Sequence, residues 1–119
     1  MDVLLDYKVA VLVMDYDARI VDACDWNTRV GLFAVKPAVV LVRMDELSEW
    51  CAFYPTDDPE HSADLLSRLK ELGFNVEILI PASGGAAVVR LNGPGSKAVR
   101  AKASSHMVAL CMAAIEAVQ

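Results

Sequence analysis

The stretch that decides the fold closes the chain and reads SHMVALCMAAIEAVQ, residues 105–119. It holds one acidic residue, Glu116, and no Lys or Arg, so a helix here is apolar nearly all round. At 3.6 residues per turn the apolar side chains divide into two faces. The first face consists of Met107, Leu110, Cys111, Ala114 and Val118, and the second consists of Val108, Met112 and Ile115. Such a helix must be covered on more than one side, and the rest of the chain has to supply that cover.

Three alternating segments precede this helix and predict an antiparallel meander. They run over Asn75–Pro81, Ala86–Asn92 and Ala98–Ala103, with turns rich in Gly, Ser and Asn between them. The last segment has small apolar residues on one face. That face suits the first face of the closing helix, whose N-cap we expect at Ser104 or Ser105.

The middle of the chain contains the clearest helix, which begins at Pro59 with Asp58 as its N-cap. Gly73 follows it as a residue that accepts the left-handed conformation. Its core stripe is predicted to be Ala63, Leu65, Leu66, Leu69 and Leu72, with Ser62 outside.

The N-terminal segment Val3–Tyr16 is compatible with two structures. Three valines within Lys8–Met14 favour a buried strand by propensity, whereas helical spacing places Leu5, Val9, Leu12, Val13 and Tyr16 on one side. A helix here would cover the second face of the closing helix and allow a monomer. A strand would leave that face, with Met112 and Ile115, as a homodimer interface.

The segment Asp17–Trp50 is rich in β-formers. Ala18–Ala23 is a candidate strand, and the apolar runs Arg29–Val35 and Ala38–Arg43 predict a hairpin with its turn at Lys36-Pro37. A short helical turn is expected over Met44–Trp50, with Asp45 near its start. Together these elements predict a single α+β domain over residues 1–119, with a three-stranded meander and a hairpin packed against two to three helices.

Length and hydropathy limit the classes of protein to which this chain can belong. A chain of 119 residues, 55% apolar and with a mean hydropathy of +0.37, can form one domain with a real core. No apolar run approaches the roughly 20 residues that span a bilayer, and the opening MDVLLD lacks the positive flank of a secretory signal. We expect a cytoplasmic protein whose excess apolar surface indicates a homo-oligomer or a partner-binding face.

Charge is distributed unevenly along the chain. Residues 1–60 hold twelve Asp and Glu against five Lys and Arg, a net charge of −7. Residues 61–119 hold four against six, a net charge of +2, and the sum is −5. A chain with a pI near 4.8 is a poor nonspecific binder of nucleic acid, but its acidic half can attract a basic protein surface.

The sequence contains no motif that predicts catalysis, a metal site or a cofactor. The cysteines are too far apart for a CxxC pair, and their odd number argues against a disulfide framework: Cys24, Cys51 and Cys111. Gly93–Lys97 has Ser and Lys in the wrong order for a phosphate-binding loop and predicts a turn. The carboxylates near His61 are those that a helix N-terminus favours, and Ser105-His106 lacks the GxSxG context of a nucleophile.

Aromatic and acidic residues are interleaved between positions 25 and 58. Tyr and Trp beside carboxylates are typical of protein-binding surfaces, although the same rings can fill the core. The candidate partner-binding residues are Trp26, Asp45, Glu46, Glu49, Trp50, Tyr54, Asp57 and Asp58.

Three blocks of this sequence resemble the phage ABA sandwich domain, a family of bacteriophages and prophages. LDYKVAVLVMDY at residues 5–16 resembles the family's opening Leu-Asp-x-x-Val-Ala-x-x-Val-Met-Gly-aromatic helix, with Asp15 in place of Gly. YPTD at 54–57, ADLL at 63–66 and ELGF at 71–74 resemble its Tyr/Phe-Ser-Thr-Asp loop and second helix, with Pro55 in place of Ser. ASSHMVALCMAAIEA at 103–117 resembles its closing helix. The resemblance implies helices against a small antiparallel sheet, favours a helix over residues 3–16 and carries no general assigned activity.

This resemblance, the small size and the acidic first half predict a non-enzymatic phage accessory protein in the cytoplasm of the infected or lysogenic host. We expect it to bind a bacterial protein and to inhibit a defence system such as CRISPR, because an acidic face can occupy a basic groove that otherwise takes nucleic acid. The alternative is a protein that sequesters a nucleotide signal through Arg90, Arg100 and Lys102. Neither function requires a membrane or direct binding to nucleic acid.

Overall fold

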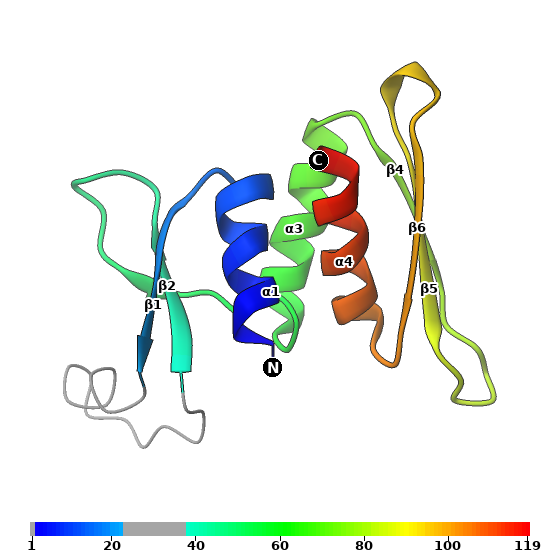
Figure 1. Ribbon diagram of the computed structural model, residues 1–119, viewed down its shortest axis with the longest axis horizontal. Helices are drawn as coiled ribbons and strands as arrows, with labels where there is room; N and C mark the ends of the chain where they lie inside the picture. Colours follow the sequence, from blue (N-terminus) through cyan, green and yellow to red (C-terminus); the bar gives the residue numbers. More distant parts are fainter. Residues whose placement is uncertain (1, 23–37) are drawn as a thin grey trace.

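The computed structural model describes residues 2–22 and 38–119. Within these ranges the chain forms three helices and two three-stranded antiparallel sheets, which confirms the predicted α+β class. The sheets lie at opposite ends of a molecule measuring 45 × 36 × 19 Å, and the helices lie between them (Figure 1).

The first sheet is built from β1 (Asp17–Asp22), β2 (Ala38–Arg43) and β3 (Cys51–Ala52), in the order β1-β2-β3. β1 is antiparallel to β2 along its whole length, from Asp17 opposite Arg43 to Asp22 opposite Ala38. Four consecutive residues of β2, 39–42, are buried. The predicted strands at Ala18–Ala23 and Ala38–Arg43 are thus present to within one residue, and the predicted hairpin partner Arg29–Val35 lies outside the described residues.

The second sheet is the predicted meander, with β4 (Asn75–Leu79), β5 (Ala87–Asn92) and β6 (Ala98–Ala103) in sequence order. Burial alternates along β5 and β6, as the period of two requires. The inner face is formed by Ala87, Val89, Leu91, Val99 and Ala101. A short 3-10 helix, η2 (Pro94–Ser96), closes the turn between β5 and β6.

Helix α3 (Pro59–Glu71) begins and ends where its sequence predicts. The Asp58 carboxylate accepts a hydrogen bond from the Glu60 N–H at 2.8 Å, and Gly73 takes a φ of +93°. Leu65 and Leu69 are fully buried, but Ala63 is exposed and Ser62 is buried, so the predicted stripe was wrong at these two positions. The helix is rotated so that the 62, 65 and 69 row faces inward.

The N-terminal segment is helical rather than extended. Helix α1 (Val3–Lys8) starts after the N-cap Asp2 and continues as a π-helical segment, η1 (Val9–Val13). Val9, Ala10 and Val13 are at most 1% exposed, and η1 contacts both α3 and the closing helix. Tertiary burial on several sides therefore outweighs the local strand propensity of the three valines.

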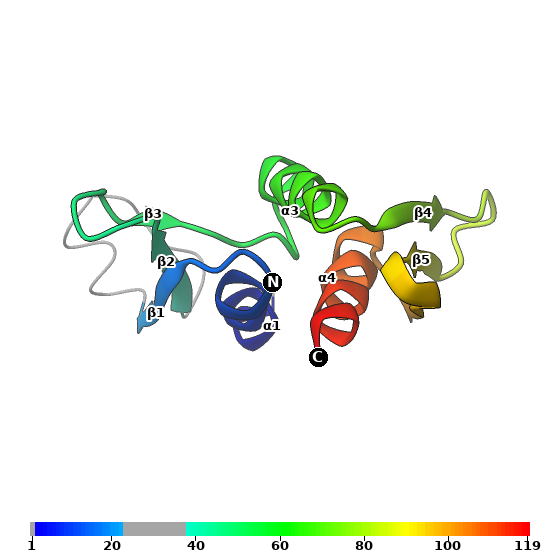
Figure 2. The ribbon, with the colours of Figure 1, turned by 90° about the horizontal axis from the view of Figure 1, so that it is seen from above.

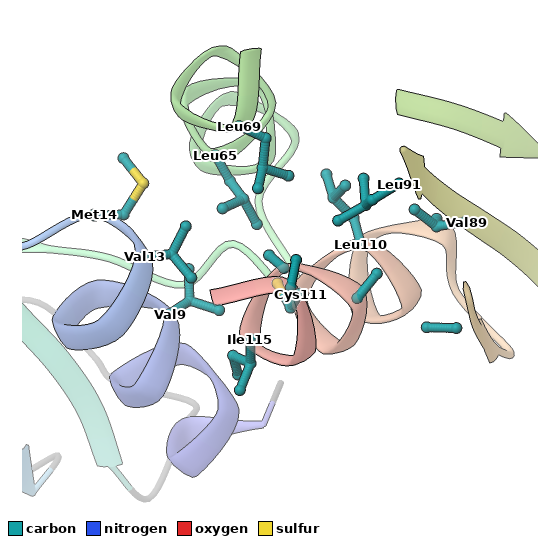
Figure 3. Close-up of a cluster of buried hydrophobic side chains, with 14 of the residues drawn as sticks. Val9, Val13, Met14, Leu65, Leu69, Val89, Leu91, Leu110, Cys111 and Ile115 are labelled. Atoms are coloured by element: carbon teal, nitrogen blue, oxygen red, sulfur yellow. The ribbon is translucent and has the colours of Figure 1, made fainter. Parts of the chain in front are cut away.

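The closing helix α4 (His106–Val118) lies at the centre of the molecule, with Ser105 as its N-cap. Figure 2 shows α4 between α1 and the second sheet, with α3 along one side of the two helices. Side chains of α4 meet side chains from η1, α3 and β5 in the core (Figure 3). Seven of its thirteen residues are buried: Ala109, Leu110, Cys111, Ala113, Ala114, Ile115 and Ala117. Small side chains on α4 let two layers approach it closely.

The two predicted faces of α4 differ in how they are covered. Leu110, Cys111 and Ala114 of the first face are buried, whereas Met107 and Val118 are half-buried. Of the second face, Ile115 is buried, Val108 is half-buried and Met112 is 42% exposed. The helical N-terminus thus supplies part of the cover that the sequence required.

A buried carboxylate connects α1 to the loop before α3. Asp6 is fully buried, and its Oδ1 accepts a hydrogen bond from the Thr56 N–H at 3.0 Å. Thr56 Oγ1 in turn accepts one from the Asp2 N–H at 3.2 Å. Asp6 Oδ2 has no partner among the described residues, and burial raises the pKa of this carboxyl although hydrogen bonds from Thr56 oppose the shift.

Helices long and apolar enough to cross a bilayer are absent from residues 2–22 and 38–119.

Candidate protein-interaction surface

The connection between β2 and β3, residues 44–50, closes as a single tight turn. Asp45 Oδ1 accepts hydrogen bonds from the Leu47 N–H at 2.8 Å and from the Ser48 hydroxyl at 3.0 Å. The Ser48 N–H donates to the Asp45 carbonyl at 3.2 Å. The Ser48 hydroxyl and then the Leu47 N–H lower the pKa of the Asp45 carboxyl. The turn expected at Met44–Trp50 is therefore present, with Asp45 at its start, but it does not extend into a helix.

This turn exposes two large apolar side chains. Leu47 is 97% exposed and Met44 is 77% exposed, the highest values among the large apolar residues of the described chain. Glu46 and Glu49, which are also exposed, flank Leu47 in sequence. The turn thus presents an exposed leucine together with exposed acidic residues, and its own hydrogen bonds hold its shape.

Trp50 anchors the turn to the first sheet. Its ring lies between two guanidinium groups, with the Arg19 Cζ 4.4 Å and the Arg43 Cζ 4.6 Å from the ring centroid. Arg43 also donates from Nε to Asp17 Oδ2 at 2.7 Å. Contacts from β1 and β2 therefore hold this half-buried ring, so its structural role accompanies the predicted role in binding.

A groove of about 510 Å³ separates the turn from α3. A second hollow of about 350 Å³ adjoins it and shares Tyr16, Met44 and Asp64. The groove is lined by Tyr16, Val42, Arg43, Met44, Ser48, Glu49, Cys51, Ala52, Phe53, His61 and Asp64. Because Met44 lines both hollows, a partner that covers the turn can extend into them.

The α3 side of the groove is organised around His61. Its Nδ1 accepts a hydrogen bond from the Tyr54 N–H at 3.1 Å, which assigns the proton of the neutral ring to Nε2. The ring lies 4.8 Å from that of Tyr54 and 5.4 Å from that of Phe53, measured between centroids. These contacts give His61 a structural role. In the described ranges no three His, Cys, Asp or Glu residues gather in a way that could hold a metal ion.

The structure distributes the predicted partner-binding residues over two places. Four lie on the turn: Asp45, Glu46, Glu49 and Trp50. Tyr54, Asp57 and Asp58 lie in the loop before α3; Tyr54 contacts His61, and Asp58 caps the helix. Burial tends to raise the pKa of Asp58, but hydrogen bonds to the carboxylate, first of all from the Glu60 N–H, outweigh it and lower the pKa. Trp26 lies outside the described residues.

The most exposed apolar residue of the surface, Leu47, is absent from the sequence-based set, as are Met44 and the two arginines. A sequence signal for Leu47 exists, since Asp45-x-x-Ser48 predicts a side-chain-capped turn and apolar residues at such a turn have nowhere to be buried. The arginine contacts to Trp50 join segments far apart in sequence, and no local pattern indicates them.

The three cations considered for a nucleotide site share the outer face of the second sheet. Arg90 of β5 lies directly opposite Arg100 of β6, and Lys102 lies opposite Val88. All three are exposed. Like charges in direct cross-strand register repel each other, so this face can stabilise an anion.

No known family model matches this chain, and neither does any curated protein or solved structure.

Proposed function

We propose that this chain is a non-enzymatic phage or prophage protein that binds a bacterial host protein through the turn at residues 44–50. Binding places the chain over a functional groove of the host protein and blocks it sterically. The host protein is a component of a defence system that handles nucleic acid, as for an anti-CRISPR protein, and the complex forms in the host cytoplasm.

The observation that carries the proposal is Leu47, which is 97% exposed at the tip of a turn held by Asp45. Binding loses less conformational entropy when a loop already has its bound shape. An apolar side chain on such a loop can enter a pocket of the partner and act as a hot spot. Met44 and the adjoining groove offer the partner further apolar area.

The acidic residues of the turn support a partner with a basic surface. Asp45, Glu46 and Glu49 lie on the same turn as Leu47, and residues 1–60 carry a net charge of −7. A surface that binds nucleic acid is basic, and carboxylates favour its approach and orient the complex. We expect complex formation to slow as salt increases, because salt screens this attraction.

Two structural details support the resemblance to the phage ABA sandwich domain. Asp15, which stands where that family has Gly, has a φ of +59°, in the region that glycine favours. Asp6 from the opening block receives the hydrogen bond from Thr56 of the second block. The quoted motifs therefore occupy positions with a structural requirement.

A phage plating assay tests the proposal. Bacteria that each carry one defence system are supplied with wild-type chain, with Leu47→Asp, or with the control Leu79→Asp, whose leucine is 43% exposed on β4. Wild type and the control should restore plating against one system, and Leu47→Asp should not. For the purified target, Leu47→Asp should raise Kd at least about tenfold, as loss of a hot spot does. Inhibition by Leu47→Asp equal to that of wild type would refute the role of the turn.

The alternative, binding of a nucleotide signal, is favoured by the alignment of Arg90 with Arg100 across β5 and β6. A nucleotide phosphate would then contact both guanidinium groups. A panel of nucleotides should raise the Tm of wild type and leave the Tm of Arg100→Glu unchanged. If no nucleotide stabilises the wild type, the alternative is wrong.

A further inference from the structure

A second exposed apolar surface lies on the side of α1 and η1 that faces away from the core. Leu4 is 66% exposed, Leu12 is 48% exposed and Val11 is 38% exposed. The inner side of η1 holds Val9 and Val13, which are at most 1% exposed. A helix that is apolar on both sides is normally covered on both sides.

A groove of about 500 Å³ lies between α1 and α4. Six residues line this groove: Leu5, Lys8, Met112, Ile115, Glu116 and Gln119. Figure 2 shows α3 on one side of the pair formed by α1 and α4, and no described helix on the other. Met112, which lines the groove, is 42% exposed.

The charges of this groove indicate what covers it. Its lining carries one cation, Lys8, and one anion, Glu116, both exposed. Neither makes an ion pair within the described part of the chain. A two-fold axis through the groove would set Lys8 of each copy opposite Glu116 of the other, so the surface is complementary to itself.

Electrostatics also favours a second copy at this place. Each chain carries a net charge of −5, so two copies repel each other over most of their surfaces. The charged side chains of the groove lining, Lys8 and Glu116, cancel each other, so two acidic chains can come together there without net repulsion. We propose that the chain forms a two-fold symmetric homodimer through this α1/α4 surface, with Leu4, Leu12 and Met112 at its apolar centre.

The proposed dimer surface is distinct from the turn at residues 44–50, because the lining of the α1/α4 groove shares no residue with the groove beside that turn. The dimer and the proposed function can therefore fail independently. A dimer would present two turns, so attachment to a target with two sites would gain avidity.

Charge exchange tests the dimer. Sedimentation velocity over a concentration series should show wild type passing from monomer to dimer. Lys8→Glu and Glu116→Lys should each weaken association by about 10- to 100-fold, because each places like charges opposite each other twice. The double variant Lys8→Glu/Glu116→Lys should dimerise again, and an equimolar mixture of the two single variants should form a heterodimer.

The matched control is Lys70→Glu, the same charge change at an exposed position of α3, which should dimerise as wild type does. Circular dichroism melts should show that all variants fold, since each substituted side chain is exposed. Three outcomes would each overturn the dimer: wild type that stays monomeric at the highest concentration, single variants that associate as wild type does, or a double variant that stays monomeric.

Discussion

The buried Asp6 makes a sharp prediction about stability. Its carboxylate is the acceptor for the Thr56 N–H, and both residues are at most 4% exposed. Asp6→Ala leaves this N–H buried without an acceptor, which costs about 1–3 kcal/mol of the free energy of unfolding. For a chain of this length the loss corresponds to roughly 4 °C of Tm per kcal/mol.

The same carboxyl makes the loss depend on pH. Burial raises the pKa of Asp6 above its ordinary 3.8, so the folded chain binds this proton more tightly than the unfolded chain. The stabilisation from Asp6 is complete below the pKa that its carboxyl has in the unfolded chain. It is lost as the pH rises through the pKa of the same carboxyl in the folded chain. Neither Ala nor Asn titrates here. The free energies of unfolding of Asp6→Ala and Asp6→Asn, each relative to that of wild type, should therefore increase as the pH rises from 4 to 8.

Urea unfolding at pH 4, 6 and 8 measures both effects, with dilute protein because the pI is near 4.8. Asp6→Ala should be less stable than Asp6→Asn, since the Asn side-chain oxygen can still accept from Thr56. The control is Asp17→Ala, which removes a half-exposed carboxylate and one ion pair and should cost under about 1 kcal/mol. Loss of less than about 0.5 kcal/mol in Asp6→Ala at pH 4 would refute the role of the hydrogen bond. If the difference in free energy of unfolding between these variants and wild type is the same at all three pH values, the raised pKa of Asp6 is refuted.

Three further substitutions follow from local geometry. Asp15→Gly should raise the free energy of unfolding by about 0.5–1 kcal/mol in urea titrations, because position 15 has a φ of +59°. Gly93→Ala should lower Tm by several degrees, since a Cβ there would lie 2.3 Å from the Phe74 ring; Gly85→Ala, where the nearest contact is 3.8 Å, is the control. Trp50→Ala removes two cation–π contacts and should cost about 1–2 kcal/mol, measured by thermal unfolding.

The surface that we propose for partner binding could be predicted only in part from the sequence. The acidic residues and Trp50 are recognisable as a cluster by composition, but the half-burial of Trp50 against two arginines is not. Their division into a turn and a separate loop at Tyr54–Asp58 depends on how β3 and α3 are placed. For Leu47 a local signal exists, because the side-chain-capped turn Asp45-x-x-Ser48 gives its side chain no place to be buried.

The sequence by itself determined the elements whose signals are local. Capping residues and apolar periodicity predict where α3 and α4 begin and end. Alternation of apolar and polar residues between short turns predicts β4, β5 and β6. Only the tertiary structure decided whether residues 3–16 form a helix or a strand, because the valines favour one structure and the helical spacing allows the other. The helix prevails because it covers Ile115 and buries Val9 and Val13 between α4 and α3. Burial of an apolar helix depends on contacts between distant segments, and it outweighs a propensity of less than about 1 kcal/mol per residue.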